Sequence, residues 1–527
     1  MRRLVLALTV ILASIGLAPI QAQAAPGFST AHQRIPGAGG TEIGAVVLTP
    51  TGQGAGPFPL VVMPSSWGVP NLEYVGQGSK LAKAGFQVIS YSSRGFWDST
   101  GGIDIAGPPT VADVSEVIDW AAEHTPADTS RVASVGISYG AGISLLASAQ
   151  DPRIKAVGAL SGWADLIASL NPNDTVNLQA VTALLALGNI TGRPGPEMQS
   201  LQTKFIGGDF DGAISEATAL APVRSAKTVV SQINAKQPAV FLANAFEDSI
   251  FPPTQYTDFF TQLTGPKRLL LAHGDHATPE VTGAIGLPNE VWDELAPWLK
   301  HFLAGADNGA EQEAPVQLKS QRNVWRGYAD WASVGAAKTM YLTKPAGLAR
   351  TGTLQNKASS GWSSGIAAGV PTVADSGIVL VSGALQGLLS IPVGVATPLV
   401  DRSFAGVWSG PAYGAKTIVN GAPRLHVTVT PSARDTSLFA YLYDVDALGV
   451  GSLISHKPYT LRSATPGQPK AIDLKLEATS WEVSAGHHLV LVVDTVDPRY
   501  LGRSKLGSTV SFSSPATDPA HLTVPVA

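Results

Sequence analysis

Short apolar runs alternate with amphipathic stretches along the chain from Ile43 to Leu303. The runs are apolar almost throughout, which is typical of strands buried on both faces of a sheet. They cover Ile43 to Leu48, Pro59 to Met63, Gln87 to Tyr91, Arg131 to Val135, Ile154 to Leu160, Pro238 to Asn244 and Lys267 to Ala272. Helical patterns cover Leu72 to Ala84, Val111 to Glu123, Ile143 to Ala149, Gln255 to Leu263 and Pro288 to Leu303. The alternation predicts a parallel sheet covered by helices on both faces.

Two stretches depart from this alternation. Residues 164–237 are rich in Ala, Leu and Asn and carry helical pieces without a strand signal, so we interpret them as a helical cap inserted above the sheet. Near Glu313 the composition changes to Val, Thr, Ser, Gly and Pro, in short alternating segments such as Ser437 to Tyr443. This pattern predicts an all-β sandwich or jelly roll. We therefore expect an α/β domain over residues 25–312 and a β domain over residues 313–527.

A glycine-flanked serine lies between the predicted strand at Arg131 and the following helix, in Gly136-Ile-Ser138-Tyr-Gly140. Such a serine occupies a tight strand-to-helix turn with its hydroxyl exposed above the sheet. The two glycines remove side chains that would collide in so sharp a turn. The pattern is the nucleophile elbow of α/β-hydrolases and makes Ser138 the candidate nucleophile. The alternative is a structural serine in a Gly-rich turn.

The same pattern occurs a second time, in Gly361-Trp-Ser363-Ser-Gly365. This copy follows a polar run and precedes no amphipathic helix, so it lacks the flanking elements that an elbow requires. We interpret it as a surface loop and expect Ser363 to take no part in catalysis.

A serine nucleophile needs a base within hydrogen-bond reach and a carboxylate that orients the base. In α/β-hydrolases the acid and the histidine follow the serine in that order, at the ends of later strands. Asp248 follows the strand that ends at Asn244 and is the predicted acid, with the adjacent Glu247 as the alternative.

The predicted base lies in His273-Gly-Asp-His276, which follows the strand Lys267 to Ala272. His276 is preferred because it lies deeper in the loop, from where a base can reach back to the elbow. His273 directly follows the strand and is expected to pack at its end. The two histidines lack helical spacing and a further ligand cluster, so neither a metal site nor a cofactor is predicted.

Two loops are expected to support the reaction. The backbone N–H of Tyr139, at a helix N-terminus, is the first predicted oxyanion donor. The loop after the strand at Pro59 supplies the second donor in this fold, and Trp67 is the candidate through its backbone N–H. An aromatic lid over the core is the alternative for Trp67. Arg94 and the nearby Asp98 are expected to form an ion pair that braces the elbow.

The N-terminal segment has the features of a secretory signal. Arg2 and Arg3 precede an apolar stretch from Leu4 to Ile20, and Ala22-Gln-Ala24 offers a cleavage site. We expect residues 1–24 to be a signal peptide and the mature protein to be secreted, without stable membrane insertion; an uncleaved anchor is the alternative.

The net charge of −4 provides no basic surface for nucleic acid. The absence of Cys excludes disulfides and thiolate chemistry.

At these residues the chain resembles the hydrolase family that includes cocaine esterase and the X-Pro dipeptidyl-peptidases. The resemblance is carried by Gly136 to Gly140, Arg94-Gly95, Asp248, His276, Trp298 to Leu303, Trp408 to Ala412, Leu438 to Asp446 and His488 to Asp494. It covers nearly the whole mature chain and implies an α/β-hydrolase fold with a helical cap insertion, followed by a non-catalytic C-terminal jelly-roll domain. Family members often carry a Tyr in the first oxyanion loop, where Trp67 stands here without a hydroxyl. In the loop around the base, family members usually carry Gly-Pro-Trp-x-His, whereas this chain has Ala-His-Gly-Asp-His276.

These features predict an exported serine hydrolase that cleaves acyl ester or amide bonds of small esters or short peptides through an acyl-enzyme. A dipeptidyl-peptidase needs a carboxylate in the cap for the free N-terminal ammonium. The acidic residues of the cap are Asp165, Asp174, Glu197, Asp209, Asp211 and Glu216, and their spacing singles out none. The Leu- and Ala-rich cap favours apolar acyl groups and hence esters. A secreted acyltransferase and a non-catalytic binding protein with a vestigial hydrolase domain are the alternatives. The sequence does not determine the oligomeric state.

Overall fold

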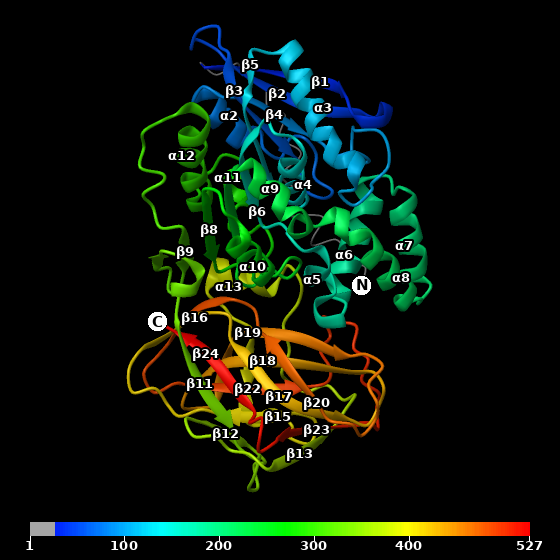
Figure 1. Ribbon diagram of the computed structural model, residues 1–527, viewed down its shortest axis with the longest axis vertical. Coiled ribbons are helices and arrows are strands. Elements are labelled where there is room, and N and C mark those ends of the chain that lie inside the picture. The colour runs from blue at the N-terminus through cyan, green and yellow to red at the C-terminus, as the bar shows by residue number, and fades with distance from the viewer. Residues whose placement is uncertain (1–26) are drawn as a thin grey trace.

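The structure is a computed structural model that describes residues 27–527. The predicted signal peptide, residues 1–24, lies outside the described residues. An α/β domain and a domain of β-strands follow one another along the longest axis of the molecule (Figure 1). Within residues 27–527, no helix is long and apolar enough to cross a bilayer. The predicted fold class, an α/β-hydrolase domain followed by an all-β domain, is confirmed.

The α/β domain is built on one ten-stranded sheet of order β1-β2-β4-β3-β5-β6-β7-β8-β9-β10. Neighbouring strands from β4 through β9 are parallel. The strands are β1 (Phe28–Pro36), β2 (Glu42–Pro50), β3 (Phe58–Pro64), β4 (Gln87–Tyr91), β5 (Ala127–Ile137), β6 (Ile154–Leu160), β7 (Ala239–Ala245), β8 (Lys267–Ala272), β9 (Val316–Lys319) and β10 (Trp325–Tyr328). The carboxyl ends of β5, β7 and β8 therefore meet along one edge of the sheet, where α/β enzymes place their sites.

Side chains of the central strands alternate between two cores. On β3, Leu60 and Val62 face one core, and Val61 and Met63 face the other. Helices α3 (Pro108–His124), α4 (Tyr139–Gln150) and α10 (Thr254–Gln262) pack on the first face. Helices α2 (Val75–Lys83), α11 (Val281–Ala284) and α12 (Glu290–Ala304) pack on the second. Both faces are buried, which is why these strands are apolar throughout rather than at every second position.

The sheet differs from the prediction at both edges. Strand β2 is antiparallel to β1 and to β4, and β10 is antiparallel to β9, so the sheet is mixed rather than wholly parallel. Strands β9 and β10 follow the predicted domain boundary at residue 313 yet add to the α/β sheet. Val316 and Leu318 of β9 insert fully buried side chains into its core. The four-residue strand β9 has the composition of the β domain, and only its pairing with β8 and β10 assigns it here.

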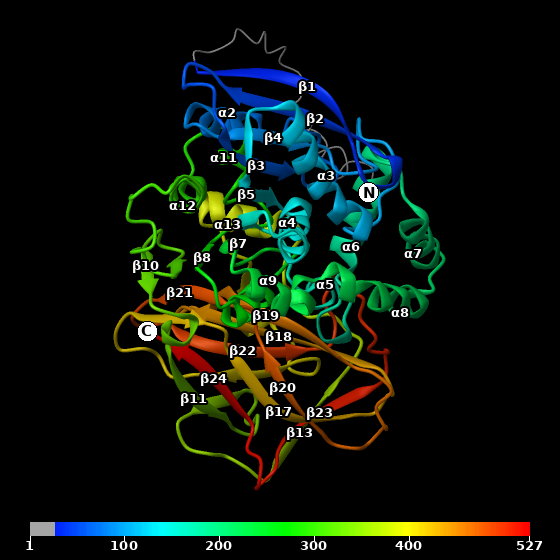
Figure 2. The same ribbon diagram turned by 45° about the horizontal axis from the view of Figure 1, so that its top comes forward.

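The cap lies between β6 and β7, as the sequence predicts. It contains α5 (Leu166–Leu170), α6 (Leu178–Thr191), α7 (Pro196–Ile206), α8 (Phe210–Leu220) and α9 (Val230–Lys236). The side chains of Asp165, Asn177 and Asp209 accept hydrogen bonds from the first-turn N–H groups of α5, α6 and α8. These N-caps start the helices where the sequence changes from loop to apolar spacing. Helices α6, α7 and α8 project from one flank of the sheet (Figure 2).

The β domain holds fourteen strands around a core that includes the fully buried Trp408. They are β11 (Ala336–Leu342), β12 (Gly352–Gln355), β13 (Trp362–Ala367), β14 (Gly394–Ala396), β15 (Gly406–Ser409), β16 (Thr417–Gly421), β17 (Arg424–Pro431), β18 (Thr436–Val445), β19 (Val450–Leu461), β20 (Lys470–Lys475), β21 (Thr479–Val483), β22 (His488–Asp494), β23 (Thr509–Ser514) and β24 (His521–Val526). One helix, α13 (Ser382–Leu389), leaves this domain and lies against the α/β domain (Figure 1).

The second Gly-x-Ser-x-Gly copy is a strand, so its prediction as a surface loop was wrong. Residues Gly361 to Gly365 run into β13, which pairs with β23. Trp362 and Ile366 are buried in the sandwich core, while Ser363 is exposed on the outer face. The small polar residues between the two apolar side chains conceal the strand in the sequence. Ser363 has neither the turn nor the helix of an elbow.

The β domain contacts the loops that carry the predicted acid and base. From the segment around α13, the N–H of Leu380 donates to Ser249 Oγ (2.9 Å) and the N–H of Gly383 donates to Asp275 Oδ2 (3.2 Å). His273 Nε2 lies 3.0 Å from the carbonyl oxygen of Ser480 on β21. The second domain therefore fixes the position of both loops.

Candidate active site

Ser138 lies at the turn between β5 and α4 with the backbone strained into φ 56° and ψ −115°. A Cβ on Gly136 would lie 2.4 Å from the carbonyl carbon of Gly140, and a Cβ on Gly140 would lie 2.0 Å from the carbonyl oxygen of Pro64. Neither distance is tolerable, so both positions require glycine. The N–H of Ser138 donates to Leu160 O at 2.8 Å, which ties the turn to β6. The strained turn holds the hydroxyl above the carboxyl edge of the sheet.

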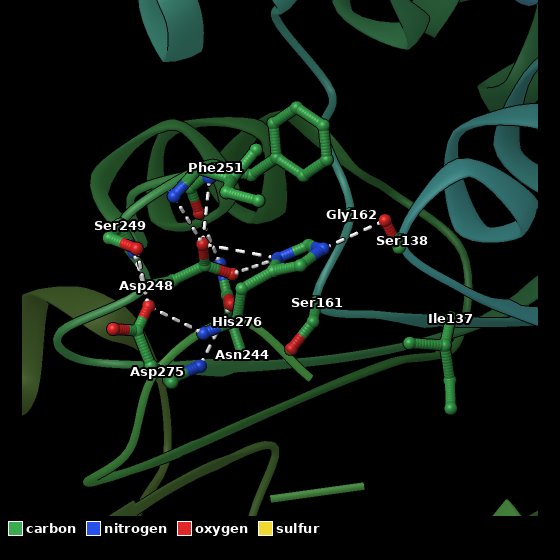
Figure 3. A network of polar contacts seen from close by, with 12 residues as sticks. Ile137, Ser138, Ser161, Gly162, Asn244, Asp248, Ser249, Phe251, Asp275 and His276 are labelled. Carbon is green, nitrogen blue, oxygen red and sulfur yellow. Dashed lines mark hydrogen bonds and ion pairs between the residues drawn. The ribbon is translucent and has the colours of Figure 1, made fainter. Parts of the chain in front are cut away.

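The structure brings Ser138, His276 and Asp248 into one hydrogen-bonded line (Figure 3). Nε2 of His276 lies 2.8 Å from Ser138 Oγ. Nδ1 of the same ring lies 2.9 Å from Asp248 Oδ2 and 3.2 Å from Oδ1. The side chains come from loops after β5, β8 and β7, so residues far apart in the sequence meet at the carboxyl edge of the sheet.

Asp248 is fixed by its own loop. Its Oδ1 accepts hydrogen bonds from the N–H groups of Ile250 (2.9 Å) and Phe251 (2.7 Å). Glu247 points the other way: its Oε1 lies 2.6 Å from His273 Nδ1, and its Oε2 accepts from the N–H of Gly274 at 3.0 Å. Glu247 and His273 thus pair with one another and not with Ser138.

The pKa of His276 is set by opposing effects. Burial lowers it, whereas the charge and hydrogen bond of Asp248 raise it, and the charges of Asp275 and Glu280 add to the rise. The net result is a pKa above the ordinary histidine value. An imidazolium at this position is therefore stabilised, as a ring that receives a proton from Ser138 requires.

Two buried carboxyl groups beside His276 were not predicted. Asp275 is fully buried, and its Oδ1 accepts from Ser249 N–H (2.9 Å), Ser249 Oγ (2.6 Å) and His276 N–H (2.8 Å), as Figure 3 shows. It therefore joins the acid loop to the base loop. The one signal in the sequence was its place between the two histidines, which does not separate a buried hub from a solvated aspartate.

Glu280 accepts a hydrogen bond from Ser161 Oγ at 2.9 Å. Burial raises its pKa to about 7. Its position was not foreseen, because the sequence around it has no strand or motif that would bring it under the base.

The predicted oxyanion donors lie beside Ser138. The indole N–H of Trp67 donates to Leu184 O of α6 at 2.9 Å, so the indole is occupied by the cap. Within residues 27–527, the hydrogen bonds of the loops include no acceptor for the backbone N–H of Trp67. The Trp67 ring meets the ring of Tyr139 edge to face at 5.1 Å. Trp67 thus packs as a lid against the elbow while its backbone N–H stays available.

The predicted ion pair between Arg94 and Asp98 is wrong. Arg94 forms a buried, bidentate pair with Asp113 of α3, with Nε–Oδ2 at 2.7 Å and Nη2–Oδ1 at 2.6 Å. The carboxylate of Asp98 instead accepts from Asn71 Nδ2 and Ser92 Oγ, both outside the ion pair. Arg94 reaches α3 because that helix packs beside the loop, a contact that sequence proximity does not predict.

A cavity of about 170 Å³ opens at Ser138 beneath the cap. Apart from Ser138, Asn171 and Arg224, the side chains in its wall are apolar or aromatic. Within residues 27–527, the wall of this cavity contains no aspartate or glutamate. The site therefore combines a hydrogen-bonded serine with an apolar chamber of the kind that binds small organic ligands.

Two family models match the chain. Residues 39–278 match the X-Pro dipeptidyl-peptidase (S15 family) model, and residues 308–523 match the model of the X-Pro dipeptidyl-peptidase C-terminal non-catalytic domain. The chain belongs to the S15 family of hydrolases. It is a serine hydrolase.

Solved structures share the whole architecture of this S15 hydrolase at low sequence identity. An aminopeptidase from a marine sediment archaeon of the Thaumarchaeota is 14% identical, with a TM-score of 0.73 over 97% of this chain and 99% of that chain. An α-amino acid ester hydrolase is 15% identical, with a TM-score of 0.73 over 97% and 98%. A CocE/NonD family hydrolase from Staphylococcus aureus is 13% identical, with a TM-score of 0.68 over 95% and 93%. At these identities the likeness concerns the fold.

Curated relatives match a shorter stretch. An uncharacterised protein of Escherichia coli strain K12 is 33% identical over 104 residues, which are 18% of this chain and 34% of that protein. An uncharacterised 31.7 kDa protein of Escherichia coli is 30% identical over 109 residues, 20% of this chain and 38% of that protein. The chain thus spans little more than a third of the curated relatives it matches.

Proposed function

We propose that this S15 hydrolase is an exported carboxylic-ester hydrolase in which Ser138, His276 and Asp248 form the catalytic triad. The observation that carries the proposal is the hydrogen-bonded line of these three side chains at the mouth of an apolar cavity. Export is supported by the sequence of residues 1–24, which has a charged start, an apolar run and an Ala-Gln-Ala24 cleavage site.

The mechanism follows from the geometry. His276 Nε2 takes the proton of Ser138 Oγ as that oxygen attacks the ester carbonyl, and Asp248 stabilises the resulting imidazolium. The N–H groups of Tyr139 and Trp67 hold the oxyanion. The imidazolium then protonates the departing alcohol, which leaves an acyl group on Ser138. Water activated by His276 releases the acid and restores the serine.

Ester substrates are favoured over N-terminal dipeptides because five of the six acidic residues of the cap already serve other partners. Five of them have a structural role in the described chain. Asp165 and Asp209 cap helices, Glu197 pairs with Arg224, Glu216 pairs with Lys204, and Asp211 pairs with Arg462 and Arg503. A free ammonium in the apolar cavity would be a buried charge without a partner, which is strongly unfavourable.

The proposal is tested with a fluorophosphonate probe, a panel of p-nitrophenyl esters and a panel of X-Pro-p-nitroanilides. We expect labelling of Ser138 and ester hydrolysis that exceeds anilide hydrolysis by at least an order of magnitude. Efficient release of X-Pro dipeptides would refute the ester preference, and no labelling at Ser138 would refute the triad. Mass spectrometry of the secreted protein should find Ala25 at its N-terminus; retention of Met1 would refute cleavage.

A further inference from the structure

The cavity under the cap lies directly against the predicted nucleophile. Ser138, Tyr139 and Trp67 all contribute to its wall, so the chamber begins where the acyl carbonyl must sit. From there, cap helices α7 and α8 line it with side chains such as Leu201, Phe205, Ala213, Ala217 and Leu220. The chamber therefore extends from the reacting carbonyl into the cap.

The polar groups in this wall do not provide a charged subsite. The guanidinium of Arg224 already has partners in the protein: Nε donates to Asp104 O at 3.2 Å, Nη1 donates to Leu220 O at 3.0 Å, and Nη2 pairs with Glu197. Asn171 contributes a neutral amide whose buried Oδ1 has no partner in the described residues. Such a wall stabilises a ligand mainly through burial of apolar surface.

The volume of the chamber limits the size of the group that it can bury. An apolar protein cavity of about 150 Å³ accommodates a benzene ring. A chamber of about 170 Å³ with an open mouth at Ser138 therefore holds an apolar group of at least similar size. An acetyl or propionyl group would leave most of this surface unfilled, and α-amino acyl groups would bring in an unpaired charge.

We infer that the cap cavity is an acyl-chain site and that the substrates are esters of medium-length carboxylic acids of roughly six to ten carbons. The inference rests on the proposed esterase function and specifies its substrate class. Each methylene buried in such a site contributes a factor of about four to binding. The acyl chain lies among α6, α7 and α8, while the alcohol leaves on the opposite side of the carbonyl.

The first test compares kcat/KM for p-nitrophenyl esters from acetate to decanoate. We expect a rise of about 250-fold between butanoate and octanoate if all four added methylenes are fully buried. In Ala217→Phe the new ring fills the chamber, so the octanoate-to-acetate ratio should fall at least tenfold. Ala219→Phe is the matched control, because Ala219 lies on the same helix but is exposed and outside the cavity wall. A flat chain-length profile, or equal effects of the two substitutions, overturns the inference.

A second test does not depend on turnover. Trp67 and Trp163 line the cavity, so 8-bromooctanoate bound there should quench tryptophan fluorescence in Ser138→Ala. Adding Ala217→Phe should raise the dissociation constant obtained from this saturable quenching at least tenfold. Adding Ala219→Phe should leave it unchanged. If quenching is absent, the acyl site is wrong even when esters are hydrolysed. If quenching is present but Ser138 takes no probe and no ester is cleaved, the proposed function fails and the acyl site stands.

Discussion

Replacing Asp248 by Asn tests the triad through a change of a single atom. Oδ1 of Asp248 accepts from the buried N–H groups of Ile250 and Phe251, and Oδ2 faces His276 Nδ1 at 2.9 Å. In Asp248→Asn the amide oxygen must stay with the two N–H groups. The reverse orientation would leave both donors unsatisfied, at a cost of about 1–3 kcal/mol each.

The amide nitrogen of the substituted residue then faces His276 Nδ1. Since this nitrogen only donates, Nδ1 becomes an acceptor and the ring proton moves to Nε2, where it points at Ser138 Oγ. A ring protonated at Nε2 cannot take the serine proton. The expected loss in kcat is about 10⁴-fold, the size found when a triad aspartate is made neutral, which corresponds to about 5 kcal/mol.

Initial rates of p-nitrophenyl ester hydrolysis measure this loss, and thermal unfolding shows whether the fold is kept. The matched control is Glu247→Gln, which changes the neighbouring carboxylate that pairs with His273. It should retain kcat within a few-fold of the wild type. A kcat of Asp248→Asn within tenfold of the wild type would refute the assignment of Asp248 as the acid. A loss of about 10⁴-fold in Glu247→Gln would refute it as well.

Three further predictions concern the nucleophile, the two histidines and the domain contact. Ser138→Ala should abolish fluorophosphonate labelling while Ser363→Ala leaves it intact, and a label on Ser363 would contradict the elbow assignment. His276→Ala should lower kcat by several orders of magnitude. In the wild type, kcat/KM should rise with pH with a midpoint above pH 6.5, because the raised pKa keeps the base protonated to higher pH. A midpoint at or below pH 6.5 would contradict this. Burial lowers the pKa of His273, but the charge and hydrogen bond of Glu247 and the carbonyl of Ser480 raise it on balance. The protonated form of His273 therefore stabilises the fold below about pH 6.5. This contribution is lost as the pH rises through the folded-state pKa. Unfolding temperatures should therefore fall over this pH range by less in His273→Phe than in the wild type, and the fall that remains comes from groups such as His276, whose pKa is also raised. Expression of residues 25–312 alone should give poorly soluble protein, since it removes β9 and β10 and exposes the loops that the β domain covers; a soluble, fully active fragment would show that the β domain is dispensable.

Local patterns in the sequence determined the order of strands and helices and the candidate nucleophile. The apolar runs mark buried strands because a strand covered on both faces has no polar side. The elbow is recognisable because its backbone leaves no room for Cβ atoms at Gly136 and Gly140. Both positions must therefore be glycine, and the sequence shows this directly. The order of Ser138, Asp248 and His276 could be predicted for a similar reason, since each follows a strand whose end lies on the same edge.

Contacts between distant segments were decided by the tertiary structure alone. The pairing of Arg94 with Asp113 rather than Asp98, and the placement of Asp275 between Ser249 and His276, depend on which loops pack together. Strands β9 and β10 join the α/β sheet through backbone pairing, which depends little on the identity of the side chains. The cavity that favours a medium-length acyl chain exists only where cap helices cover Ser138. Its volume is the space left between packed side chains, and no single stretch of the chain encodes that space.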